Sequence, residues 1–342
     1  MGLPLVLTLA LGACSSGQDP DVGNTGGTTG SGGQTASGGA NAGTGGATGG
    51  RSASGGTTHS TGGSASGGET ASGSGGRTST GGDGSGGASS SACTRELLDG
   101  LLDAYFTALG AGDPSSLPLA DGAKFTENGE VLEIGMTDFW QDAGDAKYSQ
   151  RLLDTEQCSA AAQAVVPENT TDLPVAVRLK VVSGQLTEIE TIVVRPGDYT
   201  ASFAVASDPA AIISMADGIG WHDEVPEAQR ATREELTGWI DKYFRAFPQG
   251  VCNVSQGCRR LENGGGNFSC GTGATCAQGS GSGGFDPRVI LADEVRGIAA
   301  GFTIFDYMSD GHLDMHMMKM SDGQVHAVHA LLRDTNSMSG WD

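Results

Sequence analysis

Residues 94–109 read TRELLDGLLDAYFTAL, and residues 232–247 read TREELTGWIDKYFRAF. At a constant offset of 138, nine of the sixteen positions are identical without a gap, so the two segments are copies of one repeat. In both copies apolar residues recur every three or four positions, which predicts two amphipathic helices. Thr232 and Glu235 form a capping box at the start of the second helix, and Pro248 ends it.

The repeat continues beyond the helices. Residues 127–129 read Glu-Asn-Gly, and residues 262–264 read the same. Each half then ends in two runs of alternating apolar residues around a Gly turn, over residues 175–194 and 313–332. This pattern is typical of a β-hairpin. The sequence therefore predicts an α+β fold in which helix, Glu-Asn-Gly segment, strands and final hairpin occur twice.

This order of elements resembles the nuclear transport factor 2-like (SnoaL-like) fold. The segments LPLADGAKFTENGEVLEIG, RLKVVSGQLTEIETIVVR and ADEVRGIAAGFTIFDY resemble the tandem family called domain of unknown function 8021, over about residues 93–333. The resemblance implies two cone-like domains, 93–225 and 226–342, each a curved antiparallel sheet that wraps a long N-terminal helix. It implies no reaction, because the family has no assigned chemistry. The Gly-rich stretch 264–284 departs from the family pattern.

The N-terminus predicts export. Residues 3–14 form an apolar run, LPLVLTLALGAC, that is too short to span a bilayer as a helix. Its last four residues resemble a bacterial lipobox, which implies that residues 1–14 are a lipoprotein signal peptide and that Cys14 is lipidated. The expected location is the bacterial cell envelope, on the periplasmic or surface side of a membrane. No Lys or Arg precedes the apolar run, which indicates either a start upstream of residue 1 or an atypical signal. The alternative to a lipoprotein signal is an ordinary cleaved signal peptide.

Composition separates a tether from the folded part. Residues 15–92 hold 28 Gly in 78 positions, and Val22 is their only large apolar residue, so we expect a disordered Gly/Ser/Thr-rich tether. The formal net charge is −21, and the residues after the tether carry about −19 of it. Such a charge argues against nucleic-acid binding and against docking on an anionic membrane. The expected membrane contact is therefore the lipid anchor alone.

The cysteine count agrees with export, because an even number of cysteines remains when the lipidated Cys14 is set aside. An exported domain with six cysteines predicts up to three disulfides, with about 15 possible connectivities. The six are Cys93, Cys158, Cys252, Cys258, Cys270 and Cys276. The last four are spaced C-x5-C twice, which does not fit a zinc site, so we expect them to cross-link one long loop among themselves. We predict no metal and no cofactor.

Histidines supply the first candidates for catalysis. Four of the six lie in the last hairpin, and the first half has none there, so we expect any working site in the second half. In an extended strand His312, Asp314 and His316 point to one face. Together with His329 they could form an acid/base or metal-binding group if that face lines a pocket. If that face is exposed to solvent, they are polar surface residues.

A second set of candidates comes from the Glu-Asn-Gly segments and the aromatic residues. Glu127 is a candidate general base if burial raises its pKa. The remaining candidates would contact a ligand, and they are Tyr105, Asn128, Trp140, Tyr243, Glu262 and Asn263. The alternatives are structural, since Asn-Gly is a strong turn dipeptide and aromatic residues on an amphipathic helix usually form its core.

The sequence favours three functions without deciding between them. The first is binding of a small molecule in a cone pocket at the cell envelope. The second is an isomerase, dehydratase or lyase that uses acid/base residues of one cone, because relatives of the fold include such enzymes. The third is a structural or adhesion module. In each case the two halves are expected to pack as an intramolecular pseudo-dimer.

Overall fold

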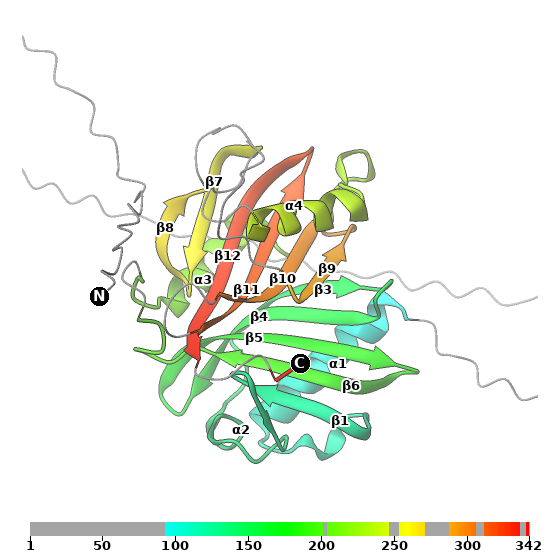
Figure 1. Ribbon diagram of the computed structural model, residues 1–342, viewed down its shortest axis with the longest axis vertical. Helices are drawn as coiled ribbons and strands as arrows, with labels where there is room; N and C mark the ends of the chain where they lie inside the picture. The colour runs from blue at the N-terminus through cyan, green and yellow to red at the C-terminus, as the bar shows by residue number, and fades with distance from the viewer. Residues whose placement is uncertain are drawn as a thin grey trace, which may run out of the picture. The chain divides into compact units, whose positions relative to one another are not determined.

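The computed structural model describes residues 93–200, 204–245, 253–270, 287–305, 311–335 and 340–341. The predicted signal peptide, the tether, Cys14, Cys252 and Cys276 lie outside these residues. The described part is mixed α+β and contains two six-stranded sheets (Figure 1). No helix in the described part is both long and apolar enough to cross a membrane.

The first sheet has the strand order β2-β1-β6-β5-β4-β3. Its elements are α1 (Arg95–Gly110), η1 (Pro114–Ser116), β1 (Leu119–Glu127), β2 (Glu130–Leu132), α2 (Asp138–Asp142), β3 (Tyr148–Asp154), β4 (Ser159–Glu168), β5 (Thr171–Val182) and β6 (Gln185–Val193). The predicted final hairpin is formed by β5 and β6, which pair antiparallel.

The second sheet repeats this order as β8-β7-β12-β11-β10-β9. Its elements are α3 (Pro209–Ile219), η2 (Glu227–Gln229), α4 (Arg233–Arg245), β7 (Val254–Glu262), β8 (Gly265–Ser269), β9 (Val289–Asp293), β10 (Ile298–Phe305), β11 (Gly311–Ser321) and β12 (Gln324–Thr335). The predicted domain boundary, between residues 225 and 226, falls between α3 and α4.

Each sheet departs from the predicted antiparallel arrangement at one pair of strands. β1 pairs parallel with β6, and β7 pairs parallel with β12. Hairpin signals in a sequence report only neighbouring strands, which a short turn forces to be antiparallel. The parallel pairs join the first strand of each half to its last, so no local pattern announces them.

Each repeat helix buries one face against its own sheet. Thr94 caps α1 by accepting a hydrogen bond from the backbone N–H of Leu97 at 3.2 Å. The apolar stripe of α1 is buried among the residues of β4, β5 and β6. α4 packs in the same way through Leu236, Ile240 and Phe244 against β10, β11 and β12. Burying these stripes is the main source of helix stability, because short helices are marginal in water.

Gly301 of β10 packs directly against α4. A Cβ at this position would lie 2.4 Å from the ring of Phe244 and 3.2 Å from Ile240. We therefore expect Gly301→Ala to lower the free energy of unfolding by about 1–3 kcal/mol. The control is Gly238→Ala in α4, where a Cβ would meet nothing within 4 Å. This control should raise stability by about 0.5–1 kcal/mol in urea titrations, and equal effects of the two changes would contradict the packing.

The faces turned away from the helices pack against each other. A third buried cluster joins residues of β3, β4, β5 and β6 to residues of β9, β10, β11 and β12. Among them, Leu313, Met315 and Met317 form one face of β11. The side chain of Gln163 donates to the carbonyls of Met315 (2.9 Å) and His329 (3.0 Å) across this contact. Both faces of β11 are therefore buried.

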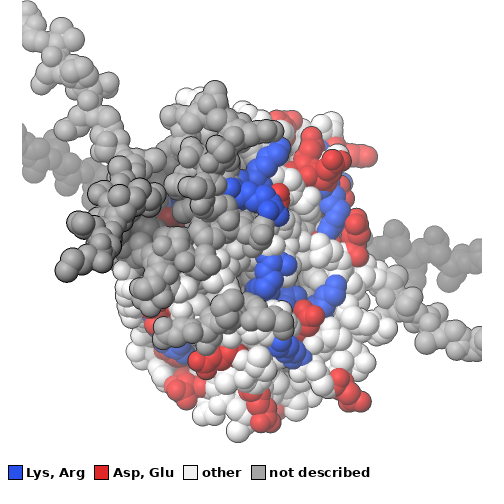
Figure 2. Space-filling model, in the orientation of Figure 1, with Lys and Arg blue, Asp and Glu red and all other residues white. Residues whose placement is uncertain are grey.

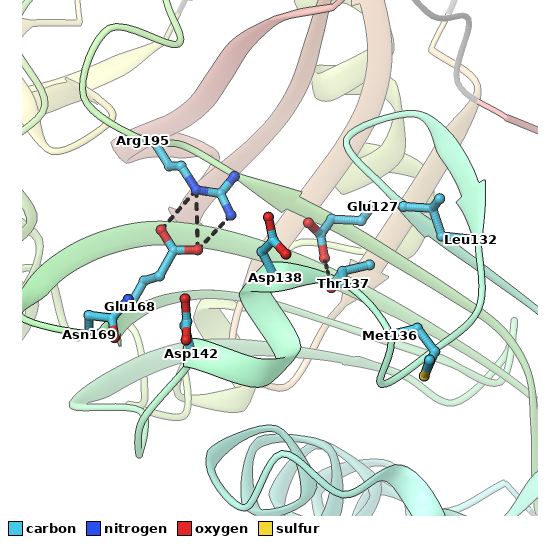
Figure 3. A pocket seen from close by; sticks show the side chains of 9 residues that line it. All are labelled: Glu127, Leu132, Met136, Thr137, Asp138, Asp142, Glu168, Asn169 and Arg195. Atoms are coloured by element: carbon cyan, nitrogen blue, oxygen red, sulfur yellow. Dashed lines mark hydrogen bonds and ion pairs between the residues drawn. The ribbon is translucent and has the colours of Figure 1, made fainter.

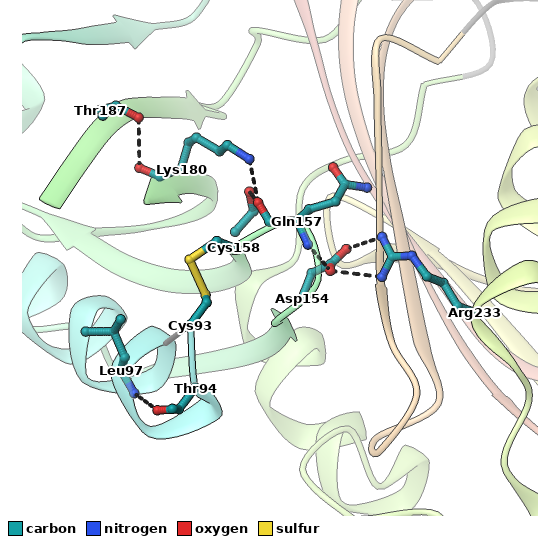
Figure 4. Close-up of a disulfide and its surroundings, with 10 residues drawn as sticks. Cys93, Thr94, Leu97, Asp154, Gln157, Cys158, Lys180, Thr187 and Arg233 are labelled. Carbon is teal, nitrogen blue, oxygen red and sulfur yellow. Dashed lines mark hydrogen bonds and ion pairs between the residues drawn. A yellow bond between two sulfur atoms is a disulfide. The ribbon is translucent and has the colours of Figure 1, made fainter. Parts of the chain in front are cut away.

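Reciprocal ion pairs explain the Thr-Arg-Glu start of both repeat helices. Arg95 of α1 donates to Asp293 at the end of β9, at 2.6 and 3.0 Å. Arg233 of α4 donates to Asp154 at the end of β3, at 2.9 and 2.8 Å (Figure 4). Both carboxylates are fully buried. Each half thus uses its helix arginine to neutralise a buried carboxylate of the other half.

Two disulfides lie within the described residues. Cys93 bonds to Cys158 beside the start of α1, and Cys258 bonds to Cys270 (Figure 4 shows the first). The second pair confirms that two of the four clustered cysteines bond to each other. The cysteines at 252 and 276 lie outside the described residues.

Charge on the face shown in Figure 2 is mixed despite the acidic composition. Lys and Arg side chains lie in the middle of this face, with Asp and Glu side chains among and around them. Several charged side chains of the first sheet are paired: Arg178 donates to Glu188 at 2.8 Å and to Glu190 at 3.0 Å. Arg288 of the second half also pairs with Glu190.

Candidate functional site

The predicted histidine face is the inner face of the second sheet. His312, Asp314 and His316 lie on one face of β11, and each is at most 3% exposed. Phe244 and Tyr243 of α4 contact His316, with ring centroids 5.3 and 4.8 Å away. The solvent-face alternative is therefore wrong, because α4 covers this face.

Three of these side chains form a hydrogen-bonded chain. His316 Nδ1 lies 2.7 Å from Asp314 Oδ1, and His316 Nε2 lies 3.0 Å from the hydroxyl of Tyr243. When Asp314 is ionised, Nδ1 carries the hydrogen and donates to the carboxylate, and Nε2 accepts from Tyr243. The chain thus orients the imidazole in the way that a catalytic base is oriented.

Burial shifts the acidity of both ends of this chain. Desolvation raises the pKa of Asp314, while the neighbouring His316 and Arg260 act against this rise. Desolvation also raises the pKa of Tyr243 to about 12, so the phenol keeps its hydrogen at neutral pH. Such groups are costly to bury and are common at functional sites.

The first half places apolar residues where the second half has this chain. Val177 pairs with Ala162 and Thr191 in the first sheet. His316 takes the same place between Gly301 and Ala330 in the second.

Two positions earlier on the same strands, Val175 of β5 corresponds to Asp314 of β11. The tyrosine of the repeat helix is kept in both halves, but the hydroxyl group of Tyr105 forms its hydrogen bond with Thr191, at 2.9 Å. The fold is therefore maintained without a charged chain in the first half.

Other polar groups at this end of the second sheet escaped the sequence analysis. His312 Nδ1 lies 2.7 Å from Asp334 Oδ1, and the ring of Tyr199 contacts His312. Arg260 of β7 pairs with Glu262, a predicted ligand contact, and lies close enough to Asp314 to lower its pKa. Asp334 and Tyr199 lie outside every motif of the repeat, so only the folded chain reveals them.

His329 does not join the predicted catalytic group. It pairs with Met317 and lies on the opposite face of the second sheet, against the first half. The cause is a bulge in β12, where His326 is the extra residue opposite the step from Lys319 to Met320 of β11. Without the bulge the register of the hairpin would place His329 opposite His316, and one extra residue moves it to the other face.

The two Glu-Asn-Gly segments are turns. Asn128 and Asn263 have φ values of 55° and 51°, followed by glycines that also have positive φ. Asn128 Oδ1 accepts from the backbone N–H of Val193, and Asn263 Oδ1 accepts from that of Leu332, both at 2.8 Å. Each asparagine thus ties the β-turn to the last strand of its sheet.

Tyr105 and Trp140 belong to the core of the first half. Both side chains are 0% exposed, and their rings meet edge to face at 5.6 Å. Neither lines a pocket described below, so the structural alternative accounts for their position.

Glu127 is one of the predicted residues that line a pocket. This pocket, of about 530 Å³, is lined by Glu127, Leu132, Met136, Thr137, Asp138, Asp142, Glu168, Asn169 and Arg195 (Figure 3). Glu127 accepts from the hydroxyl of Thr137 at 2.7 Å. Burial raises the pKa of Glu127, and the Thr137 hydrogen bond and Arg195 oppose the rise. Arg195 itself is held by Glu168.

Metal binding finds no support in the described part of the chain. Its His, Cys, Asp and Glu side chains form no group of three or more that is arranged to hold a metal ion.

A protein-family model matches part of the second half. Residues 229–332 match the domain of unknown function 8021 (DUF8021). The DUF8021 match confirms the sequence resemblance over α4 and the strands that carry His312, Asp314 and His316. No curated protein matches the chain.

Solved structures that resemble parts of the chain belong to SnoaL-like folds. One, described as a candidate polyketide cyclase from Xanthomonas campestris pv. campestris, is 20% identical and aligns over 29% of this chain and 90% of its own, with a TM-score of 0.25. Another of that description, from Silicibacter sp. TM1040, is 17% identical over the same shares, with a TM-score of 0.25. A candidate ketosteroid isomerase from Kribbella flavida is 18% identical over 34% and 94%, also with 0.25.

Proposed function

We propose that the second half binds a small organic molecule beside the Asp314–His316–Tyr243 chain and transfers a proton to or from it. The observation that carries this proposal is the buried chain itself, because the sister half has valines at the positions of Asp314 and His316. Burying a carboxylate and an imidazole costs free energy that a purely structural core avoids. The cone shape, with each sheet curved around its helix, is part of the proposal.

The chain moves the proton in balanced steps. The Tyr243 hydroxyl accepts a proton from the bound molecule while giving its own proton to His316 Nε2. Asp314 then stabilises the imidazolium through its hydrogen bond to Nδ1. Reversal of these steps returns the proton to another atom of the same molecule. An isomerase needs this sequence of transfers, whereas in a dehydratase or lyase the returned proton goes to the leaving group.

A matched pair of variants tests this assignment. We expect native mass spectrometry of the full chain, purified without denaturation, to show a bound small molecule. Tyr243→Phe and His316→Ala should lower its occupancy about tenfold or more, since each removes a buried hydrogen-bonding group. Tyr105→Phe is the control, because this tyrosine holds the same position in the first half. Loss of the molecule in the control alone would refute the proposal, and so would its absence from the wild-type chain.

The Glu127 pocket supports a second candidate site. It is open, and it contains a buried carboxyl group whose pKa is raised, as a general base requires. If this pocket holds the ligand, Glu127→Gln abolishes binding and His316→Ala leaves it unchanged. The same mass measurement therefore distinguishes the two halves.

We also propose that the protein is exported and anchored at the bacterial cell envelope through Cys14, with the two halves as an intramolecular pseudo-dimer. Two disulfides support an oxidising compartment. The reciprocal arginine–aspartate pairs support packing of the halves on each other.

A further inference from the structure

A pocket beside the second sheet has a lining whose charge is opposite to that of the Glu127 pocket. This pocket, which we call the α3 pocket, measures about 590 Å³ and lies between α3, β7 and the β11–β12 hairpin. Among the described residues that line it are Arg259, Lys319 and His326, and none is Asp or Glu. The Glu127 pocket, in contrast, is lined by four carboxylates and one arginine. In a chain of net charge −21 a basic pocket requires an explanation.

Lys319 has one hydrogen-bond donor left for a ligand. Its ammonium group donates to the carbonyls of Asp223 at 2.9 Å and Arg296 at 2.7 Å. An ammonium group carries three donors, and the third has no acceptor among the described residues. Burial lowers the pKa of Lys319 to about 8, while the carboxylates of Asp223 and Asp293 oppose this fall, and neither carboxylate lines the pocket.

Ser321 and His326 supply a hydroxyl donor at the same place. His326 Nε2 lies 2.8 Å from the hydroxyl oxygen of Ser321 and 3.2 Å from its carbonyl oxygen. A carbonyl oxygen can only accept, so both contacts are satisfied when Nε2 carries the hydrogen. The Ser321 hydroxyl hydrogen is then directed elsewhere, and both residues line the pocket.

The corresponding surface of the first half is already covered. Lys124 takes the place of Arg259 in β1, and its ammonium group lies 4.6 Å from the centre of the Trp341 ring. Lys180 takes the place of Lys319, and it donates to the carbonyl of Gln157 as Lys319 does to that of Arg296. Both lysines therefore bind the turn that precedes the neighbouring strand, β4 in the first half and β10 in the second. Arg259, in contrast, is exposed and forms no ion pair among the described residues. In the first half Lys124 stands at this position, so the arginine is particular to the second half.

We propose that the α3 pocket binds a small organic oxyanion, with Arg259, Lys319 and Ser321 as donors to its oxygens. Guanidinium and ammonium groups are the side chains that bind phosphate and carboxylate most strongly. Met215 and Ile219 of α3 give the pocket an apolar wall for the carbon part of the ligand. The volume falls within the range of small-molecule sites. This site is independent of the Asp314–His316–Tyr243 chain.

Calorimetric titration of the full chain with three probes tests the proposal. Inorganic phosphate, phenyl phosphate and benzoate are compared at matched ionic strength. We expect phenyl phosphate or benzoate to bind more tightly than inorganic phosphate, because each adds an apolar ring. The better of the two shows whether the oxyanion is a phosphate or a carboxylate. Absence of binding by all three probes would overturn the proposal.

Two variants separate the pocket from general charge effects. Arg259→Gln should raise the Kd of the better probe about tenfold, which is the usual effect of losing one charged donor. Arg245→Gln removes the same charge from α4, outside the pocket, and should leave the Kd within about twofold. Equal weakening by both variants would show that the anion binds without a defined site.

Discussion

Arg233→Ala should lower the free energy of unfolding by about 3–5 kcal/mol, because it leaves the carboxylate of Asp154 buried without its cation. Asp154 is 0% exposed and also accepts the backbone N–H of Ala292 in the other half, at 3.0 Å. Arg95→Ala should have a similar effect, since Asp293 holds the equivalent place and accepts the N–H of Leu153 at 3.1 Å. The measurement is urea unfolding of the full chain with its disulfides intact.

Arg245→Ala is the matched control for this prediction. Arg245 lies on the same helix and pairs with Asp241, but the two side chains are 55% and 35% exposed. Exposed pairs of this kind contribute less than about 1 kcal/mol. If Arg233→Ala and Arg245→Ala differ by less than about 1 kcal/mol, the reciprocal pairs do not hold the two halves together. Arg233→Lys should recover part of the loss, since it restores a charge without the paired donors.

The sequence predicts the helices and strands of this fold better than the contacts between its two halves. The duplicated helix and the terminal hairpins follow from periodicity, and both occur in the structure. The arginine of the repeat helix was visible in the sequence, but its partner lies in the other half. A pair such as Arg95 and Asp293, 198 residues apart, has no local pattern that would connect its members.

The histidines show where strand alternation stops being sufficient. Alternation correctly placed His312, Asp314 and His316 on one face of a strand. It could not show which face the helix covers, because Met315 and its neighbours on the opposite face are also buried, against the first sheet. It failed at His329 because the bulge beside Lys319 changes the register of the hairpin.

Acid should destabilise the protein through His329. Burial lowers the pKa of His329 to about 3, with His316 as a smaller cause. Its Nδ1 accepts a hydrogen bond from the amide of Gln150 at 3.1 Å, and that amide also donates to Gln163 at 2.7 Å. A proton on Nδ1 would face the Gln150 donor and place a charge between the two sheets. The folded chain therefore keeps this imidazole neutral.

Stability depends on pH because the pKa of His329 differs between the folded and the unfolded chain. The unfolded chain protonates His329 near the ordinary pKa of about 6.5, so the unfolded state binds more protons than the folded state between about pH 6.5 and 3. The stabilisation is complete above that interval and is lost as the pH falls through it, by about 3 kcal/mol from pH 7 to pH 4. Burial raises the pKa of Asp314 and Glu127, which changes stability in the opposite direction. The test must therefore compare variants.

His329→Gln isolates the contribution of this residue, because a glutamine can still accept from Gln150 but cannot gain a proton. We expect the fall in unfolding free energy between pH 7 and pH 4 to be about 3 kcal/mol smaller in this variant than in the wild type. His326→Gln, three residues away on β12 and only half-buried, measures what any such replacement on this strand contributes. An unchanged pH dependence in His329→Gln would mean that His329 is not protonated on acid unfolding. A reduced dependence would identify the contact between the two sheets as the acid-sensitive part of the fold.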